Sequence, residues 1–344
     1  MTVAELKAAL KKPPVPWLLL AGEEEYLKRH YLREIRALLV PDGGFAAFNH
    51  LRFEGEVIDF GKLTDAIKTP PVFSDYKLIE WHLADFEKMR QEELSALAEL
   101  CAMRDGHPGV TVVFYAEAER LSLGTNPKRP AKRYTELAEL IDVVYIPKST
   151  DAQLIGWINR HLSHEGITPT PTLARALLSR CGHSMDILAN ELQKLAAYAH
   201  AKGRDSLTPE DVDAVASRNF EADAFGLGNA ILAGDATLAY LNLADMKNRR
   251  IAPQKILASV FHLFCDLYTV ALLREEGLSP FDIHKKTGLH EYKVSLYLRA
   301  ASHRTAASLG ATLEKCRALD LMGKSGVADF SGLERLIAEE AAAR

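Results

Sequence analysis

The sequence has few of the residues that build disulfides, metal centres or redox sites. Its 344 residues include four cysteines, with no CxxC pair and no close Cys/His spacing. We therefore expect reduced, mostly buried thiols, as in a protein of the cytoplasm. The twelve histidines form no HExxH or HxH motif. His161 and His164 lie one helical turn apart but lack a third ligand at matching spacing, so we expect no metal there.

Long apolar runs and excess positive charge are also missing. The first apolar run, Trp17–Ala21, is followed closely by three glutamates, and a later one, Leu257–Leu273, is interrupted by His262 and Asp266. We expect neither a signal peptide nor a membrane span. The formal net charge of -4 argues against a protein that coats nucleic acid by bulk charge. Any contact with nucleic acid must then be local or shared with partners.

What is present is typical of a globular protein of two or three domains, with 48% hydrophobic and 26% charged residues. In residues 1–146, short apolar strands alternate with helical patterns. The expected strands are Trp17–Ala21, Leu51–Phe53, Lys77–Trp81, Val110–Tyr115 and Val143–Ile146. The expected helices between them are Glu24–Val40, Asp59–Lys68, Phe86–Met103 and Lys132–Ile141. This alternation predicts an α/β domain with a parallel sheet.

Beyond Pro147 the pattern is helical and shows no convincing strand. Helix start signals such as Thr208-Pro209-Glu210-Asp211 join a threonine N-cap, a proline at the first helical position and acids in the first turn. They predict four helices in a small all-α domain, residues 147–218. Six or seven further helices are expected in residues 219–344, which predicts a helical bundle.

The first strand-to-helix turn is where a parallel α/β sheet usually binds phosphate. Here that turn reads Ala21-Gly22-Glu23-Glu24-Glu25-Tyr26, with one glycine, no lysine and three carboxylates. A P-loop needs several glycines, then Lys and Ser or Thr, so we expect no nucleotide to bind. Without it, Glu117 and Glu119 after the fourth strand have no phosphate-bound metal to hold, and we interpret them as solvated acids.

Residues 279–303 resemble a helix-turn-helix, with a glycine turn at Gly288. This segment contains four lysine or arginine residues and two acidic residues, Asp282 and Glu291, which gives a net charge of +2. That charge is small for a protein that binds DNA on its own. Packing within the bundle is the better interpretation, and DNA recognition by this segment stays an alternative.

A more specific question is raised by Pro70-Pro71-Val72-Phe73-Ser74-Asp75, between an expected helix and an expected strand. Two adjacent prolines cannot continue a helix or donate to a sheet ladder, so the chain must turn or run extended, at the surface. Val72 and Phe73 are then either tucked under their own domain or presented to a partner.

Seven segments, in this order along nearly the whole chain, resemble the delta-subunit family of bacterial DNA polymerase III clamp loaders. They are LLLAGEEEYL (18–27), LTDAIKTPPVFSDYKLI (63–79), VTVVFYAEAERL (110–121), GHSMDILANELQKLAAYA (182–199), LTPEDVDAVAS (207–217), FGLGNAILAGD (225–235) and SPFDIHKKTGLHEYKVSLYLRAASH (279–303). The resemblance implies an AAA+ type fold in three parts: an α/β domain without a P-loop, a helical lid and a collar that assembles with other subunits. It also implies a protein without its own ATPase activity or cofactor.

By the same resemblance, Pro71, Val72, Phe73 and Ser74 bind the sliding clamp (beta subunit) and promote opening of its ring. Valine replaces a larger leucine of the family pattern. The implied partners are the clamp, the gamma/tau ATPase subunits and delta prime through the collar, and primed DNA, in a cytoplasmic replisome with no membrane. The family carries a DNA-facing loop near Gly323–Gly326, where this chain has no aromatic residue and Lys324 is the candidate phosphate contact.

Two alternatives follow from the same observations. One is a DNA-binding regulator that uses residues 279–303, and the other is a nucleotide-dependent AAA+ enzyme. Ser179-Arg180-Cys181 also matches the arginine-finger tripeptide of clamp-loader ATPases. Because it closes a helix outside the α/β domain, we instead expect Arg180 to satisfy carbonyls at a helix end.

Overall fold

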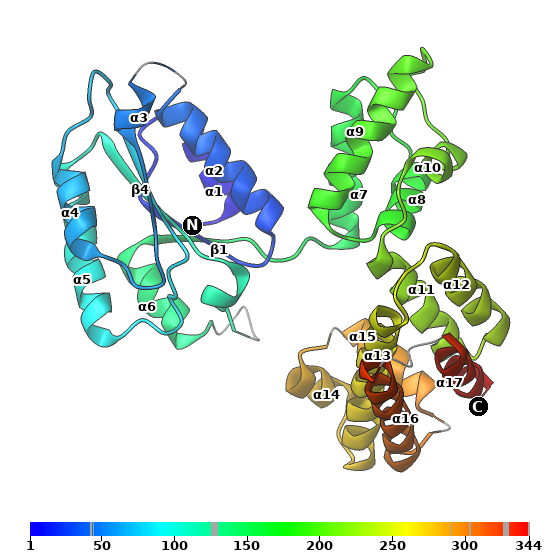
Figure 1. The fold of residues 1–344 in the computed structure, drawn as a ribbon. Coiled ribbons are helices and arrows are strands. Elements are labelled where there is room, and N and C mark those ends of the chain that lie inside the picture. The colour runs from blue at the N-terminus through cyan, green and yellow to red at the C-terminus, as the bar shows by residue number, and fades with distance from the viewer. Residues whose placement is uncertain are drawn as a thin grey trace. The chain divides into compact units, whose positions relative to one another are not determined.

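The structure is a computed structural model that describes residues 1–41, 43, 45–124, 130–289, 291–302, 304–325 and 330–342. The chain packs into two compact units, residues 1–150 and 151–344 (Figure 1). The first unit holds the sheet and the second is built of helices. The predicted fold class, a parallel α/β domain followed by all-α parts, is confirmed.

Five parallel strands form one sheet in the order β2-β3-β4-β1-β5. Their bounds are β1 (Leu18–Ala21), β2 (His50–Glu54), β3 (Lys77–His82), β4 (Val110–Tyr115) and β5 (Asp142–Tyr145). In the middle of the sheet, Leu19 of β1 lies opposite Phe114 and Val143. All five expected strands are present within two residues of their predicted bounds. Strands β1, β3 and β4 are buried along their whole length, whereas the edge strand β2 is half-buried or exposed.

Helices cover both faces of this sheet (Figure 1). Cores on the two faces separate alternate residues of β1, since Leu19 packs with α4 (Phe60–Lys68) and α5 (Gln91–Ala102), whereas Leu18 and Leu20 pack with α2 (Glu25–Leu39). The other helices of this unit are α1 (Val3–Ala9), α3 (Ala46–Asn49), α6 (Lys132–Leu140) and the short 3-10 turns η1 (Arg104–Gly106) and η2 (Ala118–Arg120).

The predicted helix Phe86–Met103 was wrong at its start, since α5 begins at Gln91. Phe86 is fully buried in the preceding loop, where its ring meets Phe114 edge-on with centroids 5.8 Å apart. A backbone N–H at Arg90 donates to the Glu93 carboxylate at 2.7 Å and marks the true helix start. Sequence analysis also missed α1 and α3, and the signal for α1 is its capping box of Thr2 and Glu5.

A buried carboxylate joins α2 to the first two strands of the sheet order. Glu80 of β3 is fully buried and accepts two hydrogen bonds from Arg36 of α2, at 2.8 and 2.9 Å. The ring nitrogens of His50 and His82 each lie 2.8 Å from its oxygens. Burial alone would raise the pKa of Glu80, but the hydrogen bonds from His50, His82 and Arg36 outweigh it and hold the pKa well below its usual value.

The second unit contains eleven helices within the described residues. They are α7 (Asp151–His164), α8 (Pro171–Cys181), α9 (Met185–Ala201), α10 (Pro209–Val215), α11 (Phe220–Ala233), α12 (Ala236–Asn248), α13 (Pro253–Glu275), α14 (Pro280–Thr287), α15 (Glu291–Ala300), α16 (Ala306–Lys324) and α17 (Phe330–Ala342). Beyond residue 219 there are seven, as many as the upper end of the expected number. The subdivision of this unit near residue 218 stays a prediction.

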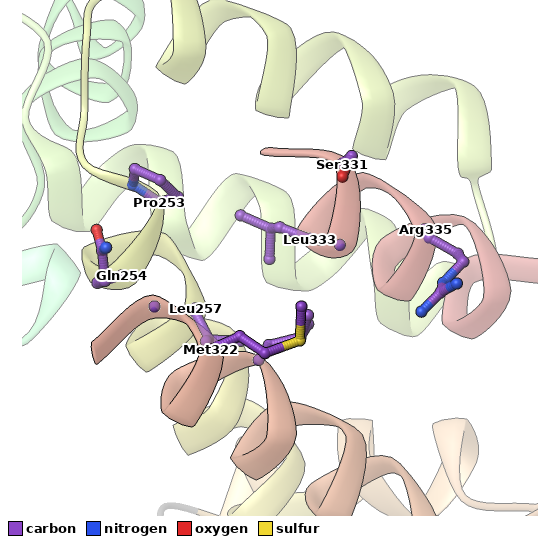
Figure 2. A pocket seen from close by; sticks show the side chains of 10 residues that line it. Pro253, Gln254, Leu257, Met322, Ser331, Leu333 and Arg335 are labelled. Carbon is purple, nitrogen blue, oxygen red and sulfur yellow. The ribbon is translucent and has the colours of Figure 1, made fainter. Parts of the chain in front are cut away.

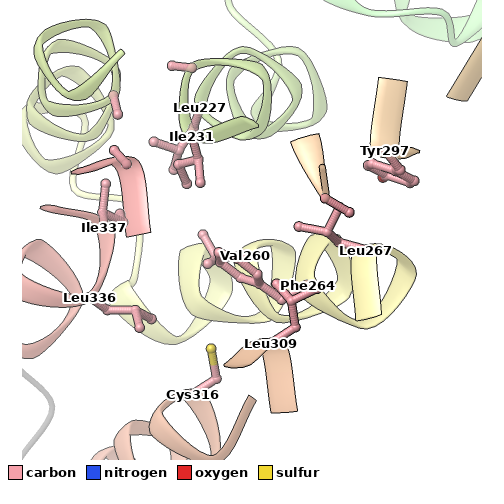
Figure 3. Packing of buried hydrophobic residues seen from close by; sticks show 14 of the residues in the cluster. Leu227, Ile231, Val260, Phe264, Leu267, Tyr297, Leu309, Cys316, Leu336 and Ile337 are labelled. Atoms are coloured by element: carbon pink, nitrogen blue, oxygen red, sulfur yellow. The ribbon is translucent and has the colours of Figure 1, made fainter. Parts of the chain in front are cut away.

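Helix α13 forms the centre of the C-terminal bundle. Its side chains Val260, Phe264 and Leu267 meet Ile231 and other apolar residues of the surrounding helices (Figure 3). Within the described residues it is the one helix long and apolar enough to cross a membrane, with a mean hydropathy of 1.9. One such helix is weak evidence for a membrane span, since a helix at the core of a helical bundle has the same apolar composition.

The segment after α10 is fastened to α8 and α9. Arg180 donates to the carbonyl oxygens of Ala216 and Asp213, at 2.6 and 2.7 Å, and pairs with the Asp213 carboxylate. Arg180 thus satisfies helix-end carbonyls, although those of α10 rather than of its own helix. Buried Glu191 of α9 accepts from the backbone N–H of Ser217 at 2.9 Å.

We expect Glu80→Gln to lower the free energy of unfolding by about 2–4 kcal/mol, because it removes the anion that compensates Arg36 and accepts hydrogen bonds from the two imidazoles. Urea denaturation at neutral pH measures the change. Since the native pKa lies below that of the unfolded chain, this contribution is present above pH of about 4.5 and declines as the pH falls further.

Glu54→Gln is the matched control for this variant. Glu54 pairs with Arg52 at 2.6 Å, but both side chains are 51% exposed. Loss of this surface pair should cost less than about 1 kcal/mol. Equal losses in the two variants would show that the buried network adds nothing beyond an ordinary surface charge.

Candidate partner-binding site

The turn that contains the two adjacent prolines connects α4 to β3 and presents an aromatic ring to solvent. We call it the Pro70–Ser74 turn. Phe73 is 86% exposed, while Val72 and Pro71 are half-buried. The backbone of Phe73 has φ +48°, in the left-handed region that non-glycine residues seldom adopt. Such a conformation persists only where the surroundings enforce it.

A buried asparagine supplies part of that enforcement. Asn49, at the end of α3, is 2% exposed. Its side-chain oxygen accepts the backbone N–H of Val72 at 2.7 Å, and its side-chain nitrogen donates to the Val72 carbonyl at 2.8 Å. The same nitrogen lies 3.3 Å from the Phe45 carbonyl. One amide therefore ties the turn to the segment that precedes β2.

The two ends of the turn are also fixed. Buried Lys77, the first residue of β3, donates to the carbonyls of Ala66 and Thr69 at the end of α4, at 2.8 and 3.1 Å. Burial lowers the pKa of this lysine. On the other side of the tip, the Ser74 hydroxyl donates to the Tyr76 carbonyl at 3.1 Å.

Aromatic residues of the α3 segment extend the apolar surface of the turn. The rings of Phe45 and Phe73 lie with centroids 4.8 Å apart, and Phe45 is itself 47% exposed. Phe48, one residue before Asn49, is 59% exposed. Phe45, Phe48 and Asn49 were not predicted from the sequence, although two phenylalanines in the short stretch Gly44-Phe45-Ala46-Ala47-Phe48 were an available signal.

The sheet topology explains why these segments meet. Strands β2 and β3 are parallel neighbours, and α3 and the Pro70–Ser74 turn come immediately before them. Both segments therefore lie at the amino edge of the sheet. Gly109, just before β4, lies at the same edge, and its carbonyl accepts the backbone N–H of Lys77 at 2.8 Å.

The opposite edge, where phosphate would bind, is occupied by the chain itself. A Cβ atom on Gly22 would lie 2.3 Å from the Ile146 carbonyl oxygen. The backbone N–H of Glu24 donates to that oxygen at 3.1 Å, and the buried Glu24 carboxylate accepts the Ser149 N–H at 3.2 Å. Residues 146–149 thus occupy the space that a phosphate would need. The Ile146 carbonyl also accepts the Glu24 N–H, which a phosphate would otherwise bind.

The first lysine after this turn is committed elsewhere. Lys28 is fully buried and donates to Glu25 and to the Ala116 carbonyl, each at 2.6 Å, and burial lowers its pKa. Tyr115 donates to the other Glu25 oxygen at 2.6 Å. Burial and then the Glu25 carboxylate raise the pKa of Tyr115. This arrangement is a closed polar network rather than a nucleotide site.

The helix-turn-helix segment is packed into the bundle. Helices α14 and α15 flank Gly288, which has φ +72°. Val294 and Tyr297 are buried in the core cluster of the bundle. Lys293 pairs with Asp266 at 3.1 Å. The predicted segment also includes His290 and His303, which lie outside the described residues.

Lys324 ends α16 and donates to Asp320 at 2.6 Å, with its side chain 71% exposed. Of the predicted DNA-facing turn, Gly326 lies outside the described residues. A cavity of about 380 Å³ lies nearby, lined by side chains that include Leu257, Met322 and Leu333 (Figure 2). Among the described residues that line it, Arg335 is the one charged side chain.

The histidine pair on α7, His161 and His164, lies in the last turns of that helix. His161 is half-buried beside Trp157, with ring centroids 5.5 Å apart, and burial lowers its pKa. Among the described residues, no three His, Cys, Asp or Glu side chains are grouped so that they can hold a metal ion.

Comparison with known proteins bears on the C-terminal bundle first. Residues 221–339 match the family described as DNA polymerase III delta subunit, C-terminal domain. The matched residues lie in helices α11 to α17 and the connections between them. The DNA polymerase III subunit delta of Bacillus subtilis is 23% identical over 332 residues, which are 95% of this chain and 93% of that protein.

The solved structure of the Bacillus subtilis DNA clamp loader delta protein aligns with a TM-score of 0.71 at 21% identity and covers 98% of this chain and 99% of that one. The likeness shows a shared fold over nearly the whole length of both chains. The chain is thus similar to delta subunits of DNA polymerase III both in sequence and in fold.

In this delta-like α/β unit, Gly109→Ala should disturb the base of the Pro70–Ser74 turn. A Cβ atom there would lie 2.7 Å from the Asp75 carbonyl oxygen. We expect the free energy of unfolding to fall by about 1–3 kcal/mol, as for other overpacked sites. Gly106→Ala is the control, since its Cβ atom would meet nothing within 4 Å. Similar losses in both variants would contradict the steric account.

We also expect isothermal titration with millimolar ATP and Mg²⁺ to give no heat of binding. Residues 146–149 and the carboxylates of the β1–α2 turn block the usual phosphate position by space and by charge. Saturable binding would contradict this and favour the nucleotide-dependent alternative.

Proposed function

We propose that this protein is a clamp-loader delta subunit that binds the sliding clamp through Pro71, Val72, Phe73 and Ser74 and promotes opening of the clamp ring for loading on primed DNA. The observation that carries the proposal is the exposure of Phe73 at the tip of an anchored turn. It is supported by the family match of the C-terminal domain and by the fold shared with the Bacillus subtilis clamp loader delta protein.

The proposed contact is an aromatic side chain that enters an apolar pocket of the clamp. An exposed aromatic ring loses its exposed area to such a pocket, and aromatic anchors of this kind supply much of the energy of an interface. Val72 is half-buried beside it and adds a smaller apolar contact. Pro71 and Ser74 set the direction of the tip.

Ring opening in this scheme needs no ATP in delta itself. If the tip binds the clamp better when one interface is open than when it is closed, that difference in affinity alone shifts the equilibrium towards the open ring. The gamma/tau ATPase subunits would control when the tip is accessible. Delta prime and gamma/tau would assemble with delta through the C-terminal collar, in a cytoplasmic replisome.

A contact of Lys324 with the DNA backbone is a weaker part of the proposal. Its ammonium is already paired with Asp320, so a phosphate would have to compete with that carboxylate. We expect Lys324→Ala to change the salt dependence of primed-DNA binding by the assembled loader only slightly. The change in slope should be smaller than the loss of one full phosphate contact would give.

We expect Val72→Ala combined with Phe73→Ala to weaken clamp binding by about 2–4 kcal/mol, or roughly 30- to 1000-fold in Kd. Surface plasmon resonance with immobilised clamp measures the affinity. The matched control is Val57→Ala combined with Phe281→Ala, whose side chains are 66% and 64% exposed elsewhere on the chain. Full affinity of the Val72/Phe73 variant would overturn the assignment of this turn.

A further inference from the structure

We propose that Asn49 is a positioning residue of the partner-binding turn, which fixes Val72 and so holds Phe73 in its outward, left-handed conformation. The inference rests on the proposed clamp contact and goes beyond it, because Asn49 lies 23 residues upstream of Val72 on a different element. It assigns to α3 a part in the binding site.

The geometry is that of a side chain that imitates a strand partner. The Asn49 amide both accepts from the N–H and donates to the carbonyl of the same residue, Val72. Two bonds to one residue fix its orientation as well as its position. Asn49 is 2% exposed, so these bonds are shielded from competing water.

The consequence of this anchor appears one residue later. With Val72 fixed, the chain reaches Phe73 at φ +48°, and the Phe73 ring stands beside Phe45 with centroids 4.8 Å apart. The Phe45 carbonyl lies 3.3 Å from the same Asn49 nitrogen. A single buried amide therefore holds both backbone segments that carry the neighbouring rings.

Holding the turn in one conformation increases affinity without adding a contact. When the binding-competent conformation is populated only in part, the apparent Kd rises in inverse proportion to that fraction. If removal of the amide leaves the outward conformation populated to about a tenth, clamp affinity falls about tenfold. The surface offered to the clamp, Val72 and Phe73, is unchanged in composition.

The test compares Asn49→Ala, Asn49→Asp and wild type in full-length protein, with clamp affinity measured by surface plasmon resonance at pH 7.5 and pH 5. Asn49→Ala should bind about tenfold more weakly than wild type at both pH values. Asn49→Asp should bind weakly at pH 7.5, because a carboxylate cannot donate to the Val72 carbonyl. At pH 5 it should recover towards wild type, since a buried carboxylic acid is protonated more readily and can then both accept and donate.

A purely structural role would not give this pH-dependent rescue, because both variants would lose affinity in proportion to lost folding. Asn159→Ala, at a half-buried asparagine of α7, is the control and should bind as wild type. In the Val72/Phe73 double-alanine background, Asn49→Ala should have no further effect on affinity.

The outcomes separate the two proposals. If the double-alanine variant keeps full affinity, the clamp contact at this turn is wrong. If it loses affinity while Asn49→Ala binds as wild type, the positioning role alone is wrong. Loss of affinity in Asn49→Asp that is the same at pH 5 and pH 7.5 also contradicts the positioning role.

Discussion

The buried Glu80 carboxylate is the interaction on which the geometry of the α/β unit depends. It accepts from Arg36 of α2 and from the rings at His50 and His82, so it ties a covering helix to the start of β2 and the end of β3. His50 directly follows Asn49, and Asn49 is hydrogen-bonded to Val72. A charge at the centre of one strand thereby helps to fix a turn at the edge of the sheet, through two adjacent residues.

The two edges of the sheet have opposite characters. Open parallel sheets usually bind ligands at the carboxyl ends of their strands. Here that edge is filled by residues 146–149 over the Gly22 turn and by the Lys28, Glu25 and Tyr115 network. The amino edge instead carries α3 and the Pro70–Ser74 turn, with exposed phenylalanines. The exposed phenylalanines of this unit, Phe45, Phe48 and Phe73, thus lie at the edge where phosphates do not bind.

Much of the fold could be predicted because its determinants are local in the sequence. Strands β1 and β4 are mainly apolar runs of four and six residues, and helix starts such as Thr170-Pro171 carry their own capping residues. The start of α5 could not be predicted, since Phe86 fits the apolar periodicity of the helix but is a buried residue of the preceding loop. Helix α3 was missed because its four residues are too few for a periodic signal.

The candidate site was predictable in part for the same reason. The double proline marks the turn at Val72 and Phe73, but the bonds from Asn49 span 23 residues and depend on the β2–β3 register, which no local pattern reveals. Phe45 is likewise brought to Phe73 by topology alone. Binding to the proposed clamp depends also on the surface of the clamp. This chain contributes the conformation that such a partner would select.

That conformation bears on how delta would act on a ring. A tip that flexed freely would follow the clamp surface through closed and open states, and its affinity for the two would differ little. A tip fixed by Asn49, with its ends held by Lys77 and Ser74, presents one shape, so a clamp interface that fits it only when strained open is favoured in that state. In the function proposed above, rigidity of the turn would turn binding energy into a preference for the open ring, and the buried polar groups behind the turn would supply that rigidity.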